Sequence, residues 1–310
     1  MTADHRSGAP RPVHISSIAA ELGTRTPLED LRSARIAQQL TVLRAEGLAH
    51  CRVAGPTAPE LAAACATRTL AAAGVRPDSV VYSSESFAGE SVTTDLWDFL
   101  LSVGTPATPA LAVNGNGCGN LANALEVARN RLRTEPDESS ALVTVADRLD
   151  HHDRYQPNGQ TVLSDGAASC LVTTAPQGPS YRVLGISCHL RADWPQDVPA
   201  MASARTVMAG VEAAVTRLRS RLPDPATEFG RLITGNYGSS TRSFLAMAAG
   251  LDPDDAYAPL AADTGHCFAA DPLLALDALE REGAVLPGER LLVLATSSRS
   301  WSAVALEYCA

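Results

Sequence analysis

A repeated alternation of predicted helices and strands is the feature that most constrains the fold of this 310-residue chain. From residue 58 an alanine-rich helix, a β-branched strand and further helices and strands follow one another up to residue 174. From residue 181 a similar order begins again with the strand "YRVLGISCHL". Such alternation predicts an α/β protein built from layers of helices and sheets. Because the residues show no clear repeat, we infer a duplication from the order of elements alone.

The sequence divides into an N-terminal tail and two halves. Residues 1–13 are rich in Arg, Pro and Gly, and we expect a flexible tail there. The segment "TAPQGPSY" at 174–181 contains Pro and Gly and marks the junction between the halves. We therefore expect an N-terminal half at 14–176, with a hairpin turn at its Asp165-Gly166 pair, and a C-terminal half at 177–310.

The composition excludes several classes of function. The formal net charge of −9 argues against a nucleic-acid surface and against a basic membrane anchor. All 25 basic residues are arginine, so the chain has neither a Schiff-base lysine nor the lysine of a phosphate-binding P-loop. No apolar segment resembles a signal peptide or a membrane span, and we expect a cytoplasmic protein.

One of the seven cysteines lies in an unusual place. The cysteines are scattered and lack CxxC spacing, which indicates neither a disulfide framework nor a zinc site, and most are expected to be buried thiols. Cys118, in "VNGNGCGNLANALEVA", lies after a predicted strand and before a predicted helix. A thiol at a helix start lies near free backbone N–H groups, which stabilise the thiolate. The flanking Gly117 and Gly119 leave room for an acyl group, so Cys118 is a candidate nucleophile.

The glycines of this turn also allow a dinucleotide-binding interpretation. Gly115-x-Gly117 lies between a strand and a helix, as in that motif. However, Asn120 occupies the third glycine position, and the acidic pair Asp137-Glu138 precedes the next strand, where the motif requires an acid that ends it. We therefore favour the nucleophile and expect no resident cofactor.

Four segments, in order along nearly the whole chain, resemble the β-ketoacyl-carrier-protein synthase III family of the thiolase superfamily. They are "CGNLANALEVA" at the cysteine, "SDGAASCLV" at 164–172, "TGHCFAADPLLALDAL" at 264–279 and "LPGERLLVLATSSRSWSAVAL" near the end. The resemblance implies a thiolase-like five-layer αβαβα fold with two pseudo-duplicated halves, and a homodimer. It also implies that Cys118 carries an acyl group, taken from a thioester of coenzyme A or of an acyl carrier protein.

Two departures from the family pattern concern the catalytic residues. The family's first catalytic histidine is replaced in "TGNYGSSTR" by Asn236 or Tyr237, depending on a one-residue gap. The family's catalytic asparagine corresponds to His266, and Asp271 follows five residues later. This pattern resembles the synthase III-like acyltransferases of natural-product pathways, including polyketide and antibiotic biosynthesis, which use a Cys-His-Asp set.

A Cys-His-Asp set divides the chemistry clearly. His266 takes the thiol proton and later the proton of a small-molecule acceptor, while Asp271 fixes the tautomer of the imidazole. Pro272 predicts a helix start near Asp271, which leaves residues 266–271 free to curl back. Decarboxylative condensation instead needs two hydrogen-bond donors on an enolate, which His266 and Asn236 could supply only from exchanged positions. We favour transfer to a hydroxyl or amine over condensation, and over a non-catalytic subunit that only binds a carrier protein.

The remaining predictions concern the surroundings of the site. The resemblance implies that a backbone N–H near Ser298 completes an oxyanion hole with that of Cys118. The family's tryptophan that stacks on coenzyme A has no counterpart here, which favours an acyl carrier protein as donor, with Arg242 meeting its acidic face. The segment "DHHD" at 150–153 lacks a third ligand of suitable spacing, so we interpret it as a solvated loop and expect no metal.

Overall fold

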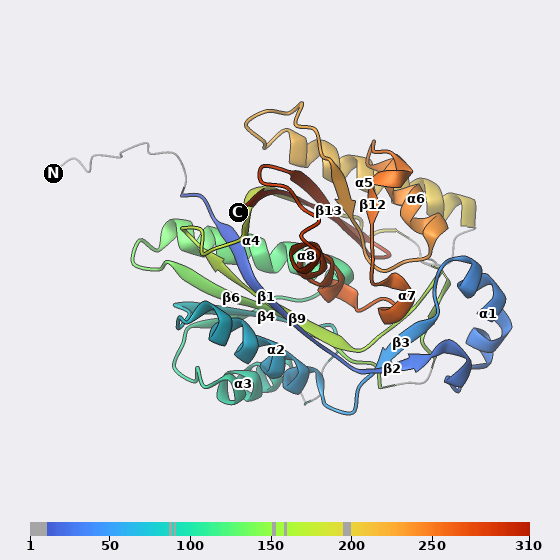
Figure 1. Cartoon of the computed structure of the whole chain (residues 1–310), viewed down its shortest axis with the longest axis horizontal. Helices are drawn as coiled ribbons and strands as arrows, with labels where there is room; N and C mark the ends of the chain where they lie inside the picture. The colour runs from blue at the N-terminus through green and yellow to red at the C-terminus, as the bar shows by residue number, and fades with distance from the viewer. Residues whose placement is uncertain (1–10, 87–88, 90, 151–152, 158–159, 195–199) are drawn as a thin grey trace.

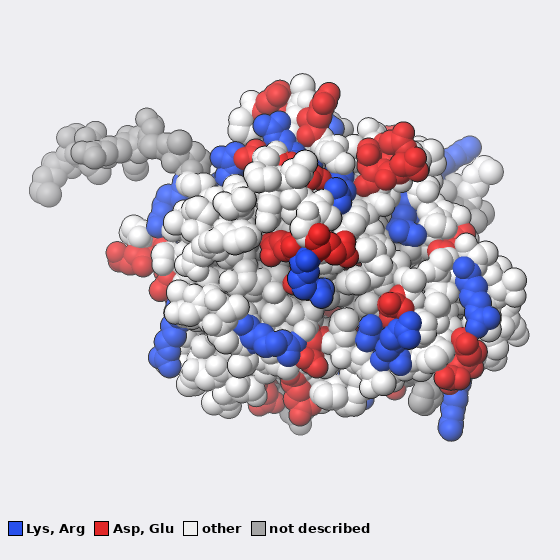
Figure 2. Space-filling model, in the orientation of Figure 1, with Lys and Arg blue, Asp and Glu red and all other residues white. Residues whose placement is uncertain are grey.

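The protein is described here by a computed structural model. It covers residues 11–310 except 87–88, 90, 151–152, 158–159 and 195–199. Figure 1 shows layers of helices alternating with layers of sheet, which is the five-layer αβαβα arrangement implied by the resemblance. In Figure 2 acidic and basic side chains are interspersed over the face that is viewed.

The N-terminal half contributes one side of the main sheet. Its strands there are β1 (His14–Leu22), β4 (Ser79–Ser83), β5 (Ala110–Ala112), β6 (Ser140–Asp147) and β9 (Gly166–Thr173). They lie in the order β1-β9-β6-β4-β5. The pairs β1/β9 and β9/β6 are antiparallel, whereas β6/β4 and β4/β5 are parallel.

The C-terminal half repeats this topology. Its strands are β10 (Ser180–Leu190), β11 (Arg231–Ile233), β12 (Ala256–Tyr257), β13 (Arg290–Thr296) and β14 (Ser300–Cys309). They lie in the order β10-β14-β13-β11-β12, with two antiparallel pairs followed by two parallel pairs. The order of elements read from the sequence therefore corresponds to two similar sheets, and the predicted boundary after residue 176 falls between β9 and β10.

The two sheets meet at the start of β1. His14 and Ile15 pair with Arg182 and Tyr181 of β10, and β1 also pairs with β9 from His14 to Leu22. The register with β9 shifts between Ser16 and Ala19, as in a β-bulge. Because a bulge bends a strand, β1 can separate from β10 while it stays paired with β9.

Helices cover both outer faces and fill the middle layer. The outer helices are α2 (Ala58–Ala73) and α3 (Val92–Val103) on the N-terminal sheet, and α5 (Ala200–Arg219) and α6 (Ser239–Ala248) on the C-terminal sheet. The middle layer holds α4 (Asn120–Thr134) and α8 (Asp271–Glu282), which pack between the sheets (Figure 1). Residues 271–276 of α8 are all buried, as expected for a helix that is surrounded on every side.

Smaller elements complete the described structure. They are α1 (Ala34–Ala45), β2 (Thr24–Pro27), β3 (His50–Val53), β7 (Tyr155–Gln156), β8 (Thr161–Val162) and α7 (Ala261–Thr264). Among the described residues, no helix combines the length and the apolar character needed to cross a membrane.

Two sequence predictions about this scaffold are wrong. Residues 11–13 are not a free tail, because Arg11 donates to the carbonyl of Leu132 and Val13 is fully buried; residues 1–10 lie outside the described part. The expected hairpin at Asp165-Gly166 is also absent from the structure. There β8 pairs with β7, whereas β9 pairs with β1 and β6.

The side chain of Asp165 explains why this segment is not a turn. Asp165 is fully buried, and its two carboxylate oxygens each lie 2.8 Å from a guanidinium nitrogen of Arg154, which is also buried. The carboxylate also accepts hydrogen bonds from the backbone N–H groups of Leu149 and Ala54. Asp165 therefore joins three segments of the N-terminal half.

We predict that Asp165→Ala lowers the free energy of unfolding by about 3–5 kcal/mol, because it leaves the Arg154 charge buried without its partner. Urea denaturation followed by circular dichroism measures the change. Glu29→Ala is the control, since it removes a carboxylate whose ion pair with Arg44 is solvent-exposed, and it should change stability little. Equal effects of the two substitutions would contradict the structural role of Asp165.

Candidate active site

Cys118 lies in a tight turn directly before the middle-layer helix α4. A single 3-10 turn, Gly117–Gly119, leads into α4, and Cys118 is 9% exposed. Gly115 and Gly117 have φ values of 91° and 54°, which favour glycine. The turn therefore holds the thiol at the helix start, as the sequence predicted.

The glycines on either side of Cys118 lie directly against the loop between β13 and β14 and against the start of β14. A Cβ added to Gly119 would lie 2.8 Å from Oγ of Ser302, and one added to Gly117 would lie 3.1 Å from Cβ of Ser297. Ser300 Oγ donates to the carbonyl of Asn116 over 2.8 Å. The space beside these glycines, where an acyl group was expected, is therefore filled by the C-terminal half.

His266 and Asp271 form a chain of contacts with the cysteine. Cys118 Sγ lies 3.0 Å from Nε2 of His266, and His266 Nδ1 lies 2.5 Å from Oδ2 of Asp271. A 3-10 turn, Phe268–Ala270, separates the two, and α8 begins at Asp271 with Pro272 in its first turn. The structure thus brings Cys118 to a His-Asp pair about 150 residues further along the chain, and residues 266–271 curl as predicted.

Both oxygens of Asp271 are held by the segment before α6 and by the turn itself. Oδ2 accepts a hydrogen bond from the backbone N–H of Asn236 over 2.7 Å. Oδ1 accepts one from Nδ2 of Asn236 over 3.0 Å and one from the N–H of Cys267 over 2.8 Å. Three N–H donors therefore hold the carboxyl group of Asp271 in place.

The sequence left open whether Asn236 or Tyr237 replaces the missing histidine, and the structure gives them different contacts. Asn236 bonds to Asp271, as described above. The ring of Tyr237 packs against His266 with centroids 4.7 Å apart, and its hydroxyl donates to the carbonyl of Thr296 over 3.0 Å. Burial, followed by the negative charge of Cys118, raises the pKa of Tyr237 well above its usual value, so the phenol keeps its proton.

The charge state of His266 follows from two opposing effects. Burial disfavours the imidazolium and lowers the pKa, since only 1% of His266 is exposed. The negative charges of Cys118 and Asp271, with their hydrogen bonds, outweigh this and raise the pKa of His266 to about 10. An imidazolium at this position lies 3.0 Å from the sulfur, close enough to pair with a thiolate.

The other predicted site residues lie further out. Ser298 belongs to the β13–β14 loop that rests on the cysteine turn. Arg242 lies in the first turn of α6 and is half-buried, and that burial lowers its pKa. It is therefore less exposed than a docking residue was expected to be.

The "DHHD" segment is only partly described, since His151 and His152 lie outside the described residues. Asp150 pairs with Arg148, and Asp153 pairs with Arg35. Among the residues that the structure covers, no group of three or more His, Cys, Asp or Glu side chains is arranged to hold a metal ion.

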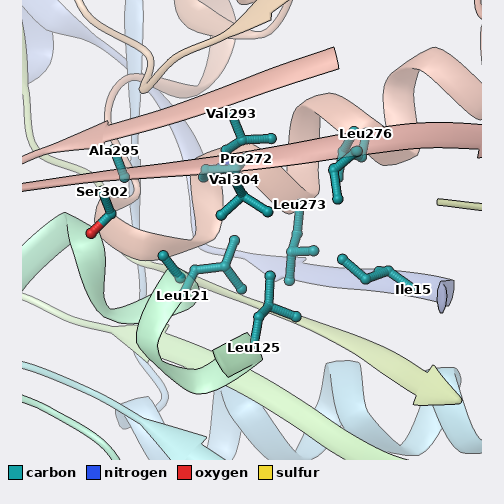
Figure 3. A pocket seen from close by; sticks show the side chains of 12 residues that line it. Ile15, Leu121, Leu125, Pro272, Leu273, Leu276, Val293, Ala295, Ser302 and Val304 are labelled. Atoms are coloured by element: carbon teal, nitrogen blue, oxygen red, sulfur yellow. The ribbon is translucent and has the colours of Figure 1, made fainter. Parts of the chain in front are cut away.

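Two cavities lie near the C-terminal sheet. The first is apolar and lies between α4 and α8, where Leu121 and Leu125 face Leu273 and Val304 (Figure 3). Its volume of about 10 Å³ holds one water at most, so the structure shows no preformed space for an acyl chain there. The second, of about 500 Å³, lies against α5 and is lined in part by Trp194 and Trp301.

Sequence reasoning missed one residue at the site, Glu85. It follows β4, and its Oε1 accepts hydrogen bonds from the N–H groups of Gly115 and Gly117 and from Nδ2 of Asn120. No motif could reveal this glutamate, because about 30 residues separate it from the turn that it contacts.

Solved structures of three proteins share this fold. ChlB3, an acyltransferase, superposes with a TM-score of 0.81 at 21% identity over 96% of this chain and 98% of ChlB3. FabH, a 3-oxoacyl-(acyl carrier protein) synthase III from Pseudomonas aeruginosa PAO1, gives 0.78 at 18% over 97% and 99%. Cerulenin-bound OleA from Xanthomonas campestris gives 0.78 at 14% over 96% and 97%. The fold implied by the resemblance to synthase III is therefore confirmed.

Sequence comparisons add nothing to this result. No family model matches the chain, and no curated protein matches it.

We predict that iodoacetamide modifies Cys118 selectively and that its rate changes little between pH 7 and pH 9, because His266 stays protonated below about pH 10. Burial raises the pKa of Cys51 to about 11 and that of Cys65 to about 12, so these thiols should react slowly. Peptide mapping by mass spectrometry gives the rate at each cysteine.

The matched variant for this prediction is His266→Ala. Without the imidazolium, modification of Cys118 at pH 7 should slow by about tenfold or more and should rise steadily with pH. A wild-type rate that already climbs tenfold per pH unit would show that no ion pair is present.

Proposed function

We propose that this protein is an acyltransferase, which moves an acyl group from a thioester donor through acyl-Cys118 to the hydroxyl or amine of a small molecule. The observation that carries the proposal is the Cys118–His266–Asp271 chain of contacts, with Sγ 3.0 Å from Nε2. This arrangement supplies a nucleophile, a proton carrier and a carboxylate that orients it.

The first half-reaction uses the ion pair directly. The Cys118 thiolate attacks the thioester carbonyl, and the bond between that carbon and the donor sulfur breaks. His266, as imidazolium, gives its proton to the departing thiolate and becomes neutral. In this proposal the backbone N–H of Cys118, with that of Ser298, stabilises the negative oxygen of the tetrahedral intermediate.

Acylation itself prepares His266 for the second half-reaction. The negative charge of Cys118 is the largest of the effects that raise the pKa of His266, and it disappears when the sulfur is acylated. The pKa of His266 then falls, while Asp271 still orients the ring. Neutral His266 takes the acceptor's proton, the acceptor attacks the acyl carbon, and the bond from that carbon to Sγ breaks, which restores the ion pair.

The contacts of Asn236 favour this reaction over decarboxylative condensation. Condensation requires a second hydrogen-bond donor beside His266, facing the enolate. The side-chain Nδ2 of Asn236 instead donates to Asp271, 3.0 Å away. Since FabH shares the fold, condensation remains the alternative that the experiment below must test.

We further propose an acyl carrier protein as the donor, and Arg242 as a residue that meets it. The name of FabH, a 3-oxoacyl-(acyl carrier protein) synthase III, supports this donor. A cytoplasmic location and a pathway of polyketide or antibiotic type stay predictions from the sequence.

We also propose that the protein is a homodimer joined at β5. In the described sheet β5 is the outermost strand of the N-terminal half, and Leu111 on it is 46% exposed. On the adjacent helix α3, Trp97 and Leu101 are exposed to 61% and 65%. An open strand edge beside large apolar side chains favours association with a second copy.

We predict that incubation with a matching acyl thioester adds one acyl mass to Cys118, and that the adduct disappears when the acceptor is added. A donor panel should contain each acyl group both as the carrier-protein thioester and as the coenzyme A thioester. His266→Ala should slow release of the acyl group by about 10²–10⁴-fold, and Asp271→Asn should slow it as well. Intact-mass spectrometry at timed intervals measures both steps.

The rival functions give different results in the same assay. Carbon dioxide released from a malonyl thioester at the rate of product formation would replace this proposal by condensation. No adduct with any donor, while iodoacetamide still modifies Cys118, would favour a non-catalytic carrier-binding subunit.

For the dimer, we predict a solution mass of twice the 32.4 kDa chain. Leu111→Asp places a charge at the proposed contact and should shift the mass toward that of one chain, measured by light scattering after size exclusion. Leu286→Asp is the control, because Leu286 is 69% exposed and belongs to the C-terminal half, away from β5. A wild-type protein with the mass of one chain would disprove the proposal.

A further inference from the structure

Glu85 makes an unusual set of contacts for a residue on the surface. It lies in the loop after β4 and is exposed to solvent. One of its two carboxylate oxygens, Oε1, accepts three hydrogen bonds. The donors are Gly115 N at 2.8 Å, Gly117 N at 3.0 Å and Asn120 Nδ2 at 2.6 Å. All three donors belong to the turn that carries Cys118 or to the first residue of α4.

Asn120 completes this arrangement from the other side. Its Oδ1 accepts the backbone N–H of Asn116 over 3.0 Å, while its Nδ2 binds Glu85. Asn120 is almost fully buried. Together, Glu85 and Asn120 hold the three consecutive N–H groups at residues 115–117.

The loop that carries Glu85 is itself fixed to the end of β6. Asp147, which is buried there, accepts the backbone N–H of Glu85 over 2.8 Å and that of Ser86 over 3.2 Å. Ser86 Oγ in turn accepts the N–H of Arg148 over 2.7 Å. A continuous series of hydrogen bonds therefore connects the end of β6, through Glu85, to the turn that carries Cys118.

The hydrogen bonds that fix the turn use the N–H groups of residues 115, 116, 117 and 119. The Glu85 carboxylate also occupies part of the positive end of α4, which the sequence analysis had assigned to the thiolate. His266 is thus the main positive charge facing Sγ.

We propose that Glu85 is a positioning residue, which holds the turn at residues 115–117 so that Sγ of Cys118 faces Nε2 of His266. The proposal rests on the acyl transfer proposed above. Because all three hydrogen bonds go to one oxygen, the role needs an acceptor at that point in space. It needs neither a negative charge nor a proton on Glu85.

Two substitutions separate position from charge. Glu85→Gln keeps an oxygen at the same distance from the backbone but removes the charge. Glu85→Asp keeps the charge but withdraws the oxygen by one methylene. We expect the Gln variant to acylate Cys118 within about threefold of the wild-type rate, and the Asp variant to be slower by about ten- to a hundredfold.

The control is Glu60→Ala. Glu60 also accepts a backbone N–H at a helix start, that of Thr57 over 2.7 Å, but at α2 on the outer layer. The Glu60→Ala substitution should change the melting temperature slightly and leave the rate of Cys118 acylation unchanged. The rate is measured as a function of donor concentration, because a misplaced thiol should lower the maximal rate more than it changes the half-saturating concentration.

Each outcome decides one question. If Glu85→Gln is as slow as Glu85→Asp, charge or proton transfer on Glu85 matters and the positioning role is wrong. If both variants match the wild type, the contacts have no role in the reaction, and the proposal is also wrong. If the wild type is modified by iodoacetamide but acylated by no donor, the proposed function fails. The alkylation rates of the two variants then still test whether Glu85 orients Cys118.

Discussion

The contact between Cys118 and His266 is the interaction on which the rest of the site depends. Both side chains are buried, so the charge on either one is tolerable only because the other lies beside it. The middle layer creates this proximity, since the turn before α4 and the turn before α8 meet between the two sheets. Asp271 contacts Nδ1 on the other side of the imidazole ring, and Asn236 in turn holds Asp271.

The sequence predicted the local parts of this arrangement well, because short-range physical rules control them. The glycines around Cys118 indicated a tight turn between a strand and a helix, and Pro272 indicated a helix start near Asp271. The helix predicted directly after Cys118 is α4. The resemblance to a known family supplied the order of layers and the pairing of Cys118 with His266 and Asp271.

The failures share a different cause, which is that contacts between distant segments override local preferences. Asp165-Gly166 has the composition of a turn, but a buried ion pair with Arg154 fixes it between two different sheets. The space beside Gly119 is filled by Ser302, about 180 residues away. Glu85 carries no signal of its role, and the contact of Asn236 with Asp271 was not expected, because these partners are set only when the chain has folded.

The division of the site between two halves has a consequence for the order in which the protein becomes reactive. A nascent chain is synthesised from its N-terminus, so the cysteine and its turn emerge well before the histidine segment and the β13–β14 loop. Until the last strands pair, the thiol has no imidazolium beside it and behaves as an ordinary cysteine. On the proposed function, the nucleophile is therefore complete only when the C-terminal half has folded.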